Sequence, residues 1–159
     1  MNIQRGRQVA VVGSSDLDLR FGSLASEVGR TVAEVGAVLI CGGLGGTMEA
    51  AARGAKEKGG LTVGIVPSYQ KESANPYIDI IVASGLGHAR NVLVAASADV
   101  VVALPGSHGT RSEVSIALKL GRPVIGIAAW GDIGQVHVVN SVEELKRELC
   151  LFFGHLVST

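Results

Sequence analysis

Residues 99–116 read DVVVALPGSHGTRSEVSI, and they join an apolar run to a glycine-rich turn and then to a helical pattern. The apolar part is continuous rather than alternating, which predicts a strand buried on both faces of a sheet. Pro105 and Gly106 end this strand, and helical spacing of apolar residues begins after Thr110. A buried strand that leads into a helix through a short turn is the repeating unit of a parallel α/β sheet.

The same unit recurs along the chain. Further apolar runs of strand length lie at 8–13, 37–43, 61–67, 78–85 and 123–129. Amphipathic segments lie between them, and the alternation predicts a single-domain, Rossmann-like, doubly wound α/β fold with a mainly parallel sheet over residues 1–159. The segment 67–77 has two prolines and no apolar period, so we expect a loop that crosses the sheet where the strand order reverses.

Helical spacing also predicts which side chains are buried. The expected inward residues are Phe21, Leu24, Val28, Val32 and Val35 in the first helix and Met48, Ala51, Ala52 and Ala55 in the second, which covers about 46–58. Ser141 to Glu144 has the spacing of a capping box, followed by a helix that should bury Leu145, Leu149 and Phe152.

Composition narrows the class of protein. Fourteen basic residues balance fourteen acidic ones, and aromatic residues make up only 4% of the chain, which argues against a strong nucleic-acid or membrane-surface field. Only Cys41 and Cys150 are present, so no disulfide framework is expected. The N-terminus lacks a secretory apolar region, and no apolar stretch reaches membrane-spanning length. We therefore expect a soluble, cytoplasmic protein.

Three of the predicted strands end in turns built for close backbone contact. The first turn is 13–15, the second is 42–47 and the third is 106–110. Parallel strands end at one edge of a sheet, where glycine allows close approach and helix N-termini favour anions. The candidate phosphate ligands in these turns are Gly13, Ser14, Ser15, Gly42, Gly43, Gly45, Gly46, Thr47, Gly106, Ser107, His108, Gly109 and Thr110.

Better-known nucleotide motifs are missing from these turns. The chain contains no GxxxxGK[ST] loop, and neither GSSDLD nor GGLGGTM has GxGxxG spacing. A simpler interpretation is that the glycines only make tight strand-to-helix turns. Three such turns at the edge where open α/β sheets bind ligands favour a phosphate cradle instead.

PGSHGTRSE resembles the PGGxGTxxE signature of the LOG family, cytokinin-activating phosphoribohydrolases that are often labelled lysine decarboxylases. CGGLGGTMEAAARGA and GHARN resemble two further segments of that superfamily. Chain length and the GGTMEAAARGA and ARN details are closer to its molybdenum-cofactor carrier protein-like branch. The resemblance implies a Rossmann-like homodimer or homotetramer with a phosphate-bearing ligand at the glycine-rich edge.

The two branches imply different functions. Carrier-like members bind the molybdenum cofactor, a phosphate-bearing pterin, without turning it over. The enzymes hydrolyse the N-glycosidic bond of nucleoside 5′-monophosphates with a glutamate and an arginine, which correspond to Glu113 and Arg90. Ser107, His108, Asn91 and the Met48-Glu49 pair depart from the enzyme pattern, which argues against cytokinin-type specificity. Glu49 and Asn91 remain candidate ligand contacts.

Several residues have a structural interpretation as well. Thr110 and Glu113 have capping-box spacing, so Glu113 caps a helix or faces a ligand. Arg90 either lies on a solvated helix face or binds phosphate through its planar fork. His88 and His108 lack a third ligand, so no metal site is expected. A carrier for a nucleotide or the molybdenum cofactor and a phosphoribohydrolase both stay open. The superfamily resembled here also includes DNA-uptake proteins, but the zero net charge and the few aromatic residues argue against that third function.

Overall fold

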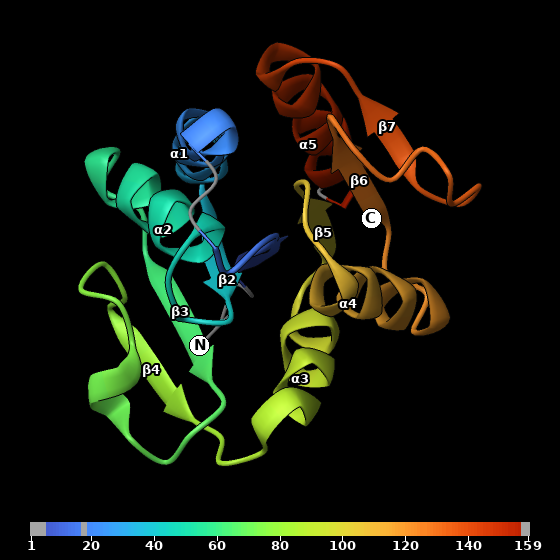
Figure 1. The fold of residues 1–159 in the computed structure, drawn as a ribbon. Coiled ribbons are helices and arrows are strands. Elements are labelled where there is room, and N and C mark those ends of the chain that lie inside the picture. Colours follow the sequence, from blue (N-terminus) through green and yellow to red (C-terminus); the bar gives the residue numbers. More distant parts are fainter. Residues whose placement is uncertain (1–5, 17–18, 157–159) are drawn as a thin grey trace.

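Seven parallel strands form one sheet with helices on both of its faces (Figure 1). The computed structural model describes residues 6–16 and 19–156, so the rest of the predicted domain lies outside the described part. The strands are β1 (Arg7–Val12), β2 (Ala37–Cys41), β3 (Thr62–Val66), β4 (Ile80–Ala83), β5 (Val100–Ala103), β6 (Val124–Ile127) and β7 (His137–Val139). The helices are α1 (Leu19–Glu34), α2 (Thr47–Glu57), α3 (Arg90–Ser97), α4 (His108–Lys119) and α5 (Val142–Leu156). The Rossmann-like α/β prediction is confirmed.

The strand order is β4-β3-β2-β1-β5-β6-β7. The two central strands, β1 and β5, pair with each other, with Val9 opposite Val100 and Val12 opposite Ala103. All four residues of β5 are inaccessible to solvent, as the continuous apolar run predicted. Apolar burial on both faces of these central strands stabilises the sheet that holds the carboxyl ends of β1 and β5 side by side.

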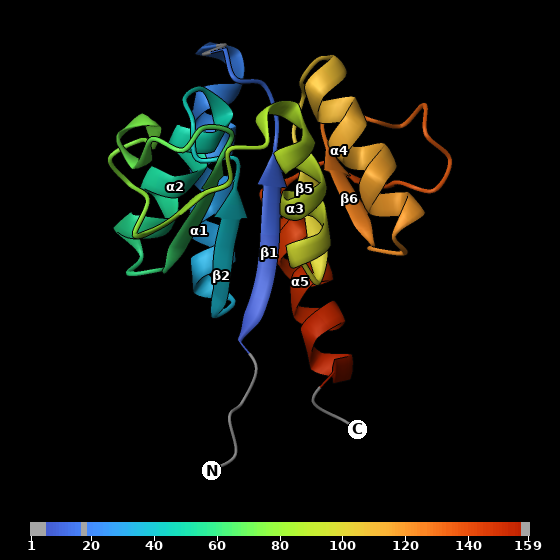
Figure 2. The same cartoon turned by 90° about the horizontal axis from the view of Figure 1, so that it is seen from below.

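Two cores lie on opposite faces of the sheet. Helices α1, α2 and α5 cover one face, and α3 and α4 cover the other (Figures 1 and 2). The first core contains Val28, Leu39 and Leu145, and the second contains Val94 and Val114. The predicted inward residues of α2 are buried, whereas Phe21 and Leu24 of α1 are half-buried. In α5 the buried aromatic ring is Phe153, one residue beyond the predicted Phe152.

The predicted crossing of the sheet at 67–77 is wrong. Strands β3 and β4 are parallel neighbours, so this loop only returns from the carboxyl end of β3 to the start of β4. Within the loop, the backbone N–H of Asn75 donates to the carbonyl of Gly43 at 2.8 Å. The crossing lies later, between β4 and β5, and contains α3. Apolar runs identify strands but carry no information on which strands pair, so the loop and the crossing segment could not be told apart.

The predicted capping box at Ser141 forms in part. The Glu144 N–H donates to Ser141 Oγ at 3.2 Å, while the Glu144 carboxylate accepts from the Asn140 N–H at 2.8 Å, one residue earlier than a capping box requires. Strand β7 was not predicted, because it has only three residues and two of them are exposed. Cys41 is a buried free thiol and Cys150 an exposed one. In the described part of the chain, no helix combines the length and apolarity that crossing a bilayer requires.

Candidate functional site

The three glycine-rich turns meet at the carboxyl edge of the sheet, the upper edge in Figure 2. The first turn bridges the other two. The Ser14 N–H donates to the Pro105 carbonyl at 3.3 Å, and the Ser14 carbonyl accepts from the Thr47 N–H at 2.9 Å. Gly13 must be glycine for this contact, because a Cβ there would stand 2.5 Å from Thr47 Cγ2. The predicted shared edge is therefore present.

A cavity of about 450 Å³ opens between these turns. This volume falls within the range of small-ligand sites, which is roughly 300–1,000 Å³. The predicted site residues that line it are Gly13, Ser14, Ser15, Gly42, Arg90, Asn91, Ser107, Gly109, Thr110 and Glu113. Strand β1, the second turn, the β3 end and the segment before α3 add further lining residues, namely Val11, Val12, Leu44, Met48, Pro67, Gly87 and His88.

The other predicted residues do not line the cavity; these are Gly43, Gly45, Gly46, Thr47, Glu49, Gly106 and His108. Some of them shape the turns instead, since Gly43 and Gly46 have φ values of 76° and 64°. The unpredicted lining residues mostly adjoin predicted ones: Met48 follows Thr47, and His88 lies in the GHARN segment. Their position beside the motifs was the available signal, but Met48 was interpreted as a packing residue.

The N-terminus of α4 faces the cavity. The helix begins at His108, and the N-cap residue Ser107 makes no side-chain hydrogen bond to the first turn. The N–H groups of a helix's first turn have no intrahelical acceptors and carry a positive partial charge. Because Ser107, Gly109 and Thr110 line the cavity, this end of α4 is suited to bind an anion.

The capping interpretation of Thr110 and Glu113 is wrong. Helix α4 starts before Thr110, so Thr110 lies inside the first turn rather than at the N-cap. Glu113 lines the cavity, with its Oε1 3.7 Å from Nη1 of Arg90. The spacing was compatible with a cap, but His108 and Gly109 are already helical, which moves the helix start toward the strand.

Arg90 is buried at the start of α3, with 8% of its surface exposed, so the solvated-face interpretation is also wrong. Its guanidinium lies over Gly42, where a Cβ would stand 2.7 Å from Cζ, Nη1 and Nη2. Nη1 donates to Asn91 Oδ1, while the buried Nε has no hydrogen-bond partner. Burial lowers the pKa of Arg90, and the charge of Glu113 opposes that shift.

Burial has the opposite effect on the carboxyl group. It raises the pKa of Glu113 to about 7, although the nearby Arg90 charge favours the ionised form. Near neutral pH the Glu113 carboxyl can therefore donate a hydrogen bond when protonated and accept one when ionised. Such a pair of groups can orient a ligand, and it can also serve acid–base chemistry.

This pKa predicts how stability depends on pH. The folded protein should keep the Glu113 proton between pH 4.5 and about 7, where the unfolded chain releases it. The free energy of unfolding should therefore fall by about 3 kcal/mol as the pH rises through this window. Glu113→Gln should remove this contribution, and urea unfolding at several pH values measures the difference between the two proteins.

The matched control is Glu34→Gln. Glu34 lies on the surface, and its hydrogen bond with Lys146 lowers its pKa, so that variant should keep the loss of stability toward neutral pH. A wild-type protein and a Glu113→Gln variant with the same pH dependence would contradict the assignment of the elevated pKa to Glu113.

No group of three or more His, Cys, Asp or Glu residues able to hold a metal ion occurs among the residues that the structure describes. The polar groups at the cavity are backbone N–H groups, hydroxyls, one amide, one guanidinium, one imidazole and one carboxyl group. This donor set suits an organic ligand that bears an anionic group.

Comparison with solved structures finds proteins that bind or carry the molybdenum cofactor. The molybdenum cofactor binding protein of Rippkaea orientalis superposes with a TM-score of 0.85 and 34% identity, over 92% of this chain and 99% of its own. The molybdenum cofactor carrier protein of Chlamydomonas reinhardtii has a TM-score of 0.85 and 31% identity, over 94% and 99% of the two chains. Both share the α/β architecture described above.

Sequence comparison finds relatives of two kinds. An uncharacterized protein of Archaeoglobus fulgidus is 44% identical over 137 residues, which are 86% of this chain and 90% of the relative. The cytokinin riboside 5′-monophosphate phosphoribohydrolase of Mycobacterium tuberculosis is 31% identical over 117 residues, 68% of this chain and 63% of the enzyme. The model of the SLOG cluster4 family matches residues 6–151. This chain belongs to the SLOG cluster4 family.

Proposed function

We propose that this protein binds and carries a phosphate-bearing heterocycle, and that the molybdenum cofactor is its ligand. The observation that carries the proposal is the buried Arg90, which lines a cavity that also receives the N-terminus of α4. A guanidinium and a helix N-terminus at one cavity both favour an anionic ligand.

In this proposal the ligand's phosphate binds at the third turn. There the N–H groups at the start of α4 and the hydroxyls of Ser107 and Thr110 supply donors, and the helix dipole favours negative charge. The heterocycle is placed toward Arg90, Asn91 and Glu113, whose amide and carboxyl groups match the alternating donors and acceptors of a pterin or purine edge. The Rippkaea binding protein and the Chlamydomonas carrier protein, which align over nearly the whole chain, support this ligand.

A second function is favoured by a separate observation. Glu113, with a pKa of about 7, and Arg90, with Nη1 3.7 Å from the carboxyl group, form the kind of pair that N-glycosidic hydrolysis uses. Ionised Glu113 would stabilise oxocarbenium charge or orient water, and Arg90 would bind the phosphate of a nucleoside 5′-monophosphate. The Mycobacterium enzyme supports this alternative.

One pair of assays separates the two functions. Purified protein is mixed with the molybdenum cofactor and passed through a desalting column, and we expect molybdenum and pterin fluorescence to elute with the protein. In parallel, the protein is incubated with a panel of nucleoside 5′-monophosphates, and chromatography should detect no free base. Release of free base by the wild type that is lost in Glu113→Gln would contradict the carrier function and support the phosphoribohydrolase. Sedimentation of the same sample tests the homodimer or homotetramer that we expect.

A further inference from the structure

The loop between β6 and β7 has an unusual backbone next to the third turn. Ala128 and Trp130 have φ values of 59° and 72°, which residues other than glycine rarely adopt. The loop also lies tightly against its own strand, because a Cβ at Gly126 would stand 2.5 Å from the Ala129 carbonyl oxygen. Backbone strain of this kind persists only where surrounding contacts enforce it.

One of these contacts reaches Leu104, two residues before the third turn. Trp130 is buried, and its indole Nε1 donates to the Leu104 carbonyl at 2.8 Å. Leu104 is fully buried, and the carbonyl of the next residue, Pro105, accepts from the Ser14 N–H. The indole therefore holds Leu104, which is followed by Pro105, the residue that leads into the third turn and is bonded to the first.

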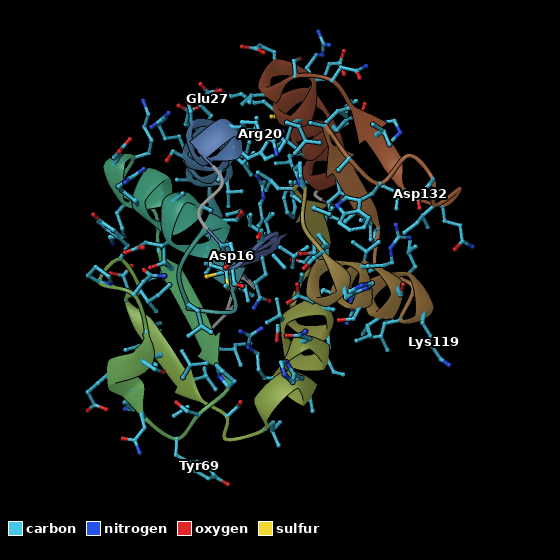
Figure 3. The ribbon with its side chains drawn as sticks, in the orientation of Figure 1. Asp16, Arg20, Glu27, Tyr69, Lys119 and Asp132 are labelled. Carbon is cyan, nitrogen blue, oxygen red and sulfur yellow. The ribbon has the colours of Figure 1, made fainter. Side chains whose placement is uncertain are left out.

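The same loop contacts the chain just after the third turn. The Arg111 guanidinium carbon lies 5.1 Å from the centroid of the Trp130 ring, and Arg111 Nη2 lies 2.9 Å from Asp132 Oδ2. Figure 3 shows Asp132 on this loop, which runs beside α4. Arg111 belongs to the first turn of α4, so the loop 128–133 contacts the chain both before and after the third turn.

We propose that Trp130 is a positioning residue that fixes the direction in which the first N–H groups of α4 face the cavity. Trp130, Arg111 and Asp132 do not line the cavity, so they act on a ligand only through the third turn. A turn held from both sides loses little freedom when an anion binds, which strengthens binding. The effect on affinity rests on the proposed phosphate site, whereas the effect on the free turn does not.

The test begins with the free protein. Trp130→Phe keeps an aromatic ring and removes the indole donor. Exchange of the two bonded amides at this turn, the Ser14 N–H to the Pro105 carbonyl and the Arg111 N–H to the Ser107 carbonyl, should become about tenfold faster, since one hydrogen bond to a buried carbonyl is lost. Exchange in the second turn should not change. Arg111→Gln alters an exposed side chain and leaves the indole in place, so it should accelerate exchange only at position 111 and by a smaller factor.

The matched control is Phe153→Leu, which truncates a buried aromatic ring that packs near Arg7, at the start of β1 and the opposite end of the sheet. Exchange of the Ser14 and Arg111 amides should match the wild type in this control. Unchanged exchange of these two amides in Trp130→Phe, or an equal increase in Phe153→Leu, would overturn the inference.

Calorimetric titration with AMP as the probe then measures affinity. We expect Trp130→Phe to bind AMP about five- to tenfold more weakly than the wild type, and Phe153→Leu to bind equally well. Faster exchange with undiminished AMP affinity would overturn the positioning role. Faster exchange in a protein that binds neither AMP nor the molybdenum cofactor would uphold the contact and count against the proposed function.

Discussion

Replacing Arg90 with glutamine should weaken binding of AMP or the molybdenum cofactor by about 100-fold, or roughly 3 kcal/mol. Arg90 supplies the guanidinium that lines the cavity, and it is buried against Gly42. A charged hydrogen bond made in such a dry setting is far stronger than one on the surface. Calorimetric titration of the two proteins measures the difference.

The matched control is Arg122→Gln. Arg122 also has a buried Nε without a partner, but it lies beside Gln8 and Asp99 at the opposite end of the sheet. This variant should bind as the wild type does. Gly42→Ala gives an independent check, because the added methyl group displaces the Arg90 head while the residue itself remains. Equal loss of affinity in Arg122→Gln would show that the loss in Arg90→Gln does not come from the cavity.

Arg90 also illustrates what sequence could not predict. The three turns could be placed from their glycines, because parallel strands must end at the same edge of the sheet. The burial of Arg90 depends on Gly42, which lies in another turn and leaves room for the guanidinium. Sequence spacing near Arg90 shows only a helix start, so its solvated and buried interpretations could not be separated without the contact between α3 and the second turn.

The errors in the prediction have the same origin. Whether 67–77 crosses the sheet depends on strand pairing, which local patterns do not contain. Helix α4 begins at His108, in a turn that is bonded to Ser14 through the Pro105 carbonyl, so Thr110 lies inside the helix rather than at its cap. Local patterns predicted the elements, and long-range contacts decided how each functional side chain is presented.

Gly46→Ala should be the most destabilising change in the second turn, by about 3 kcal/mol. Gly46 has φ 64° and ψ −130°, a conformation open to glycine, and it is the N-cap residue of α2. A Cβ there would stand 2.5 Å from the backbone carbon and oxygen of Ser15, which cannot move aside as a side chain would. The strain and the clash act together on the contact between the first and second turns.

The neighbouring glycine is the control for this prediction. Gly45→Ala places its Cβ 3.9 Å from the nearest atom, the Ser15 carbonyl oxygen, and Gly45 has no positive φ. Its free energy of unfolding should stay within about 0.5 kcal/mol of the wild type, as for other substitutions without steric conflict. Urea unfolding of both variants measures the contrast. Similar stability of the two would mean that the first turn yields to the second, and the Thr47 N–H bond to Ser14 would then not fix the site.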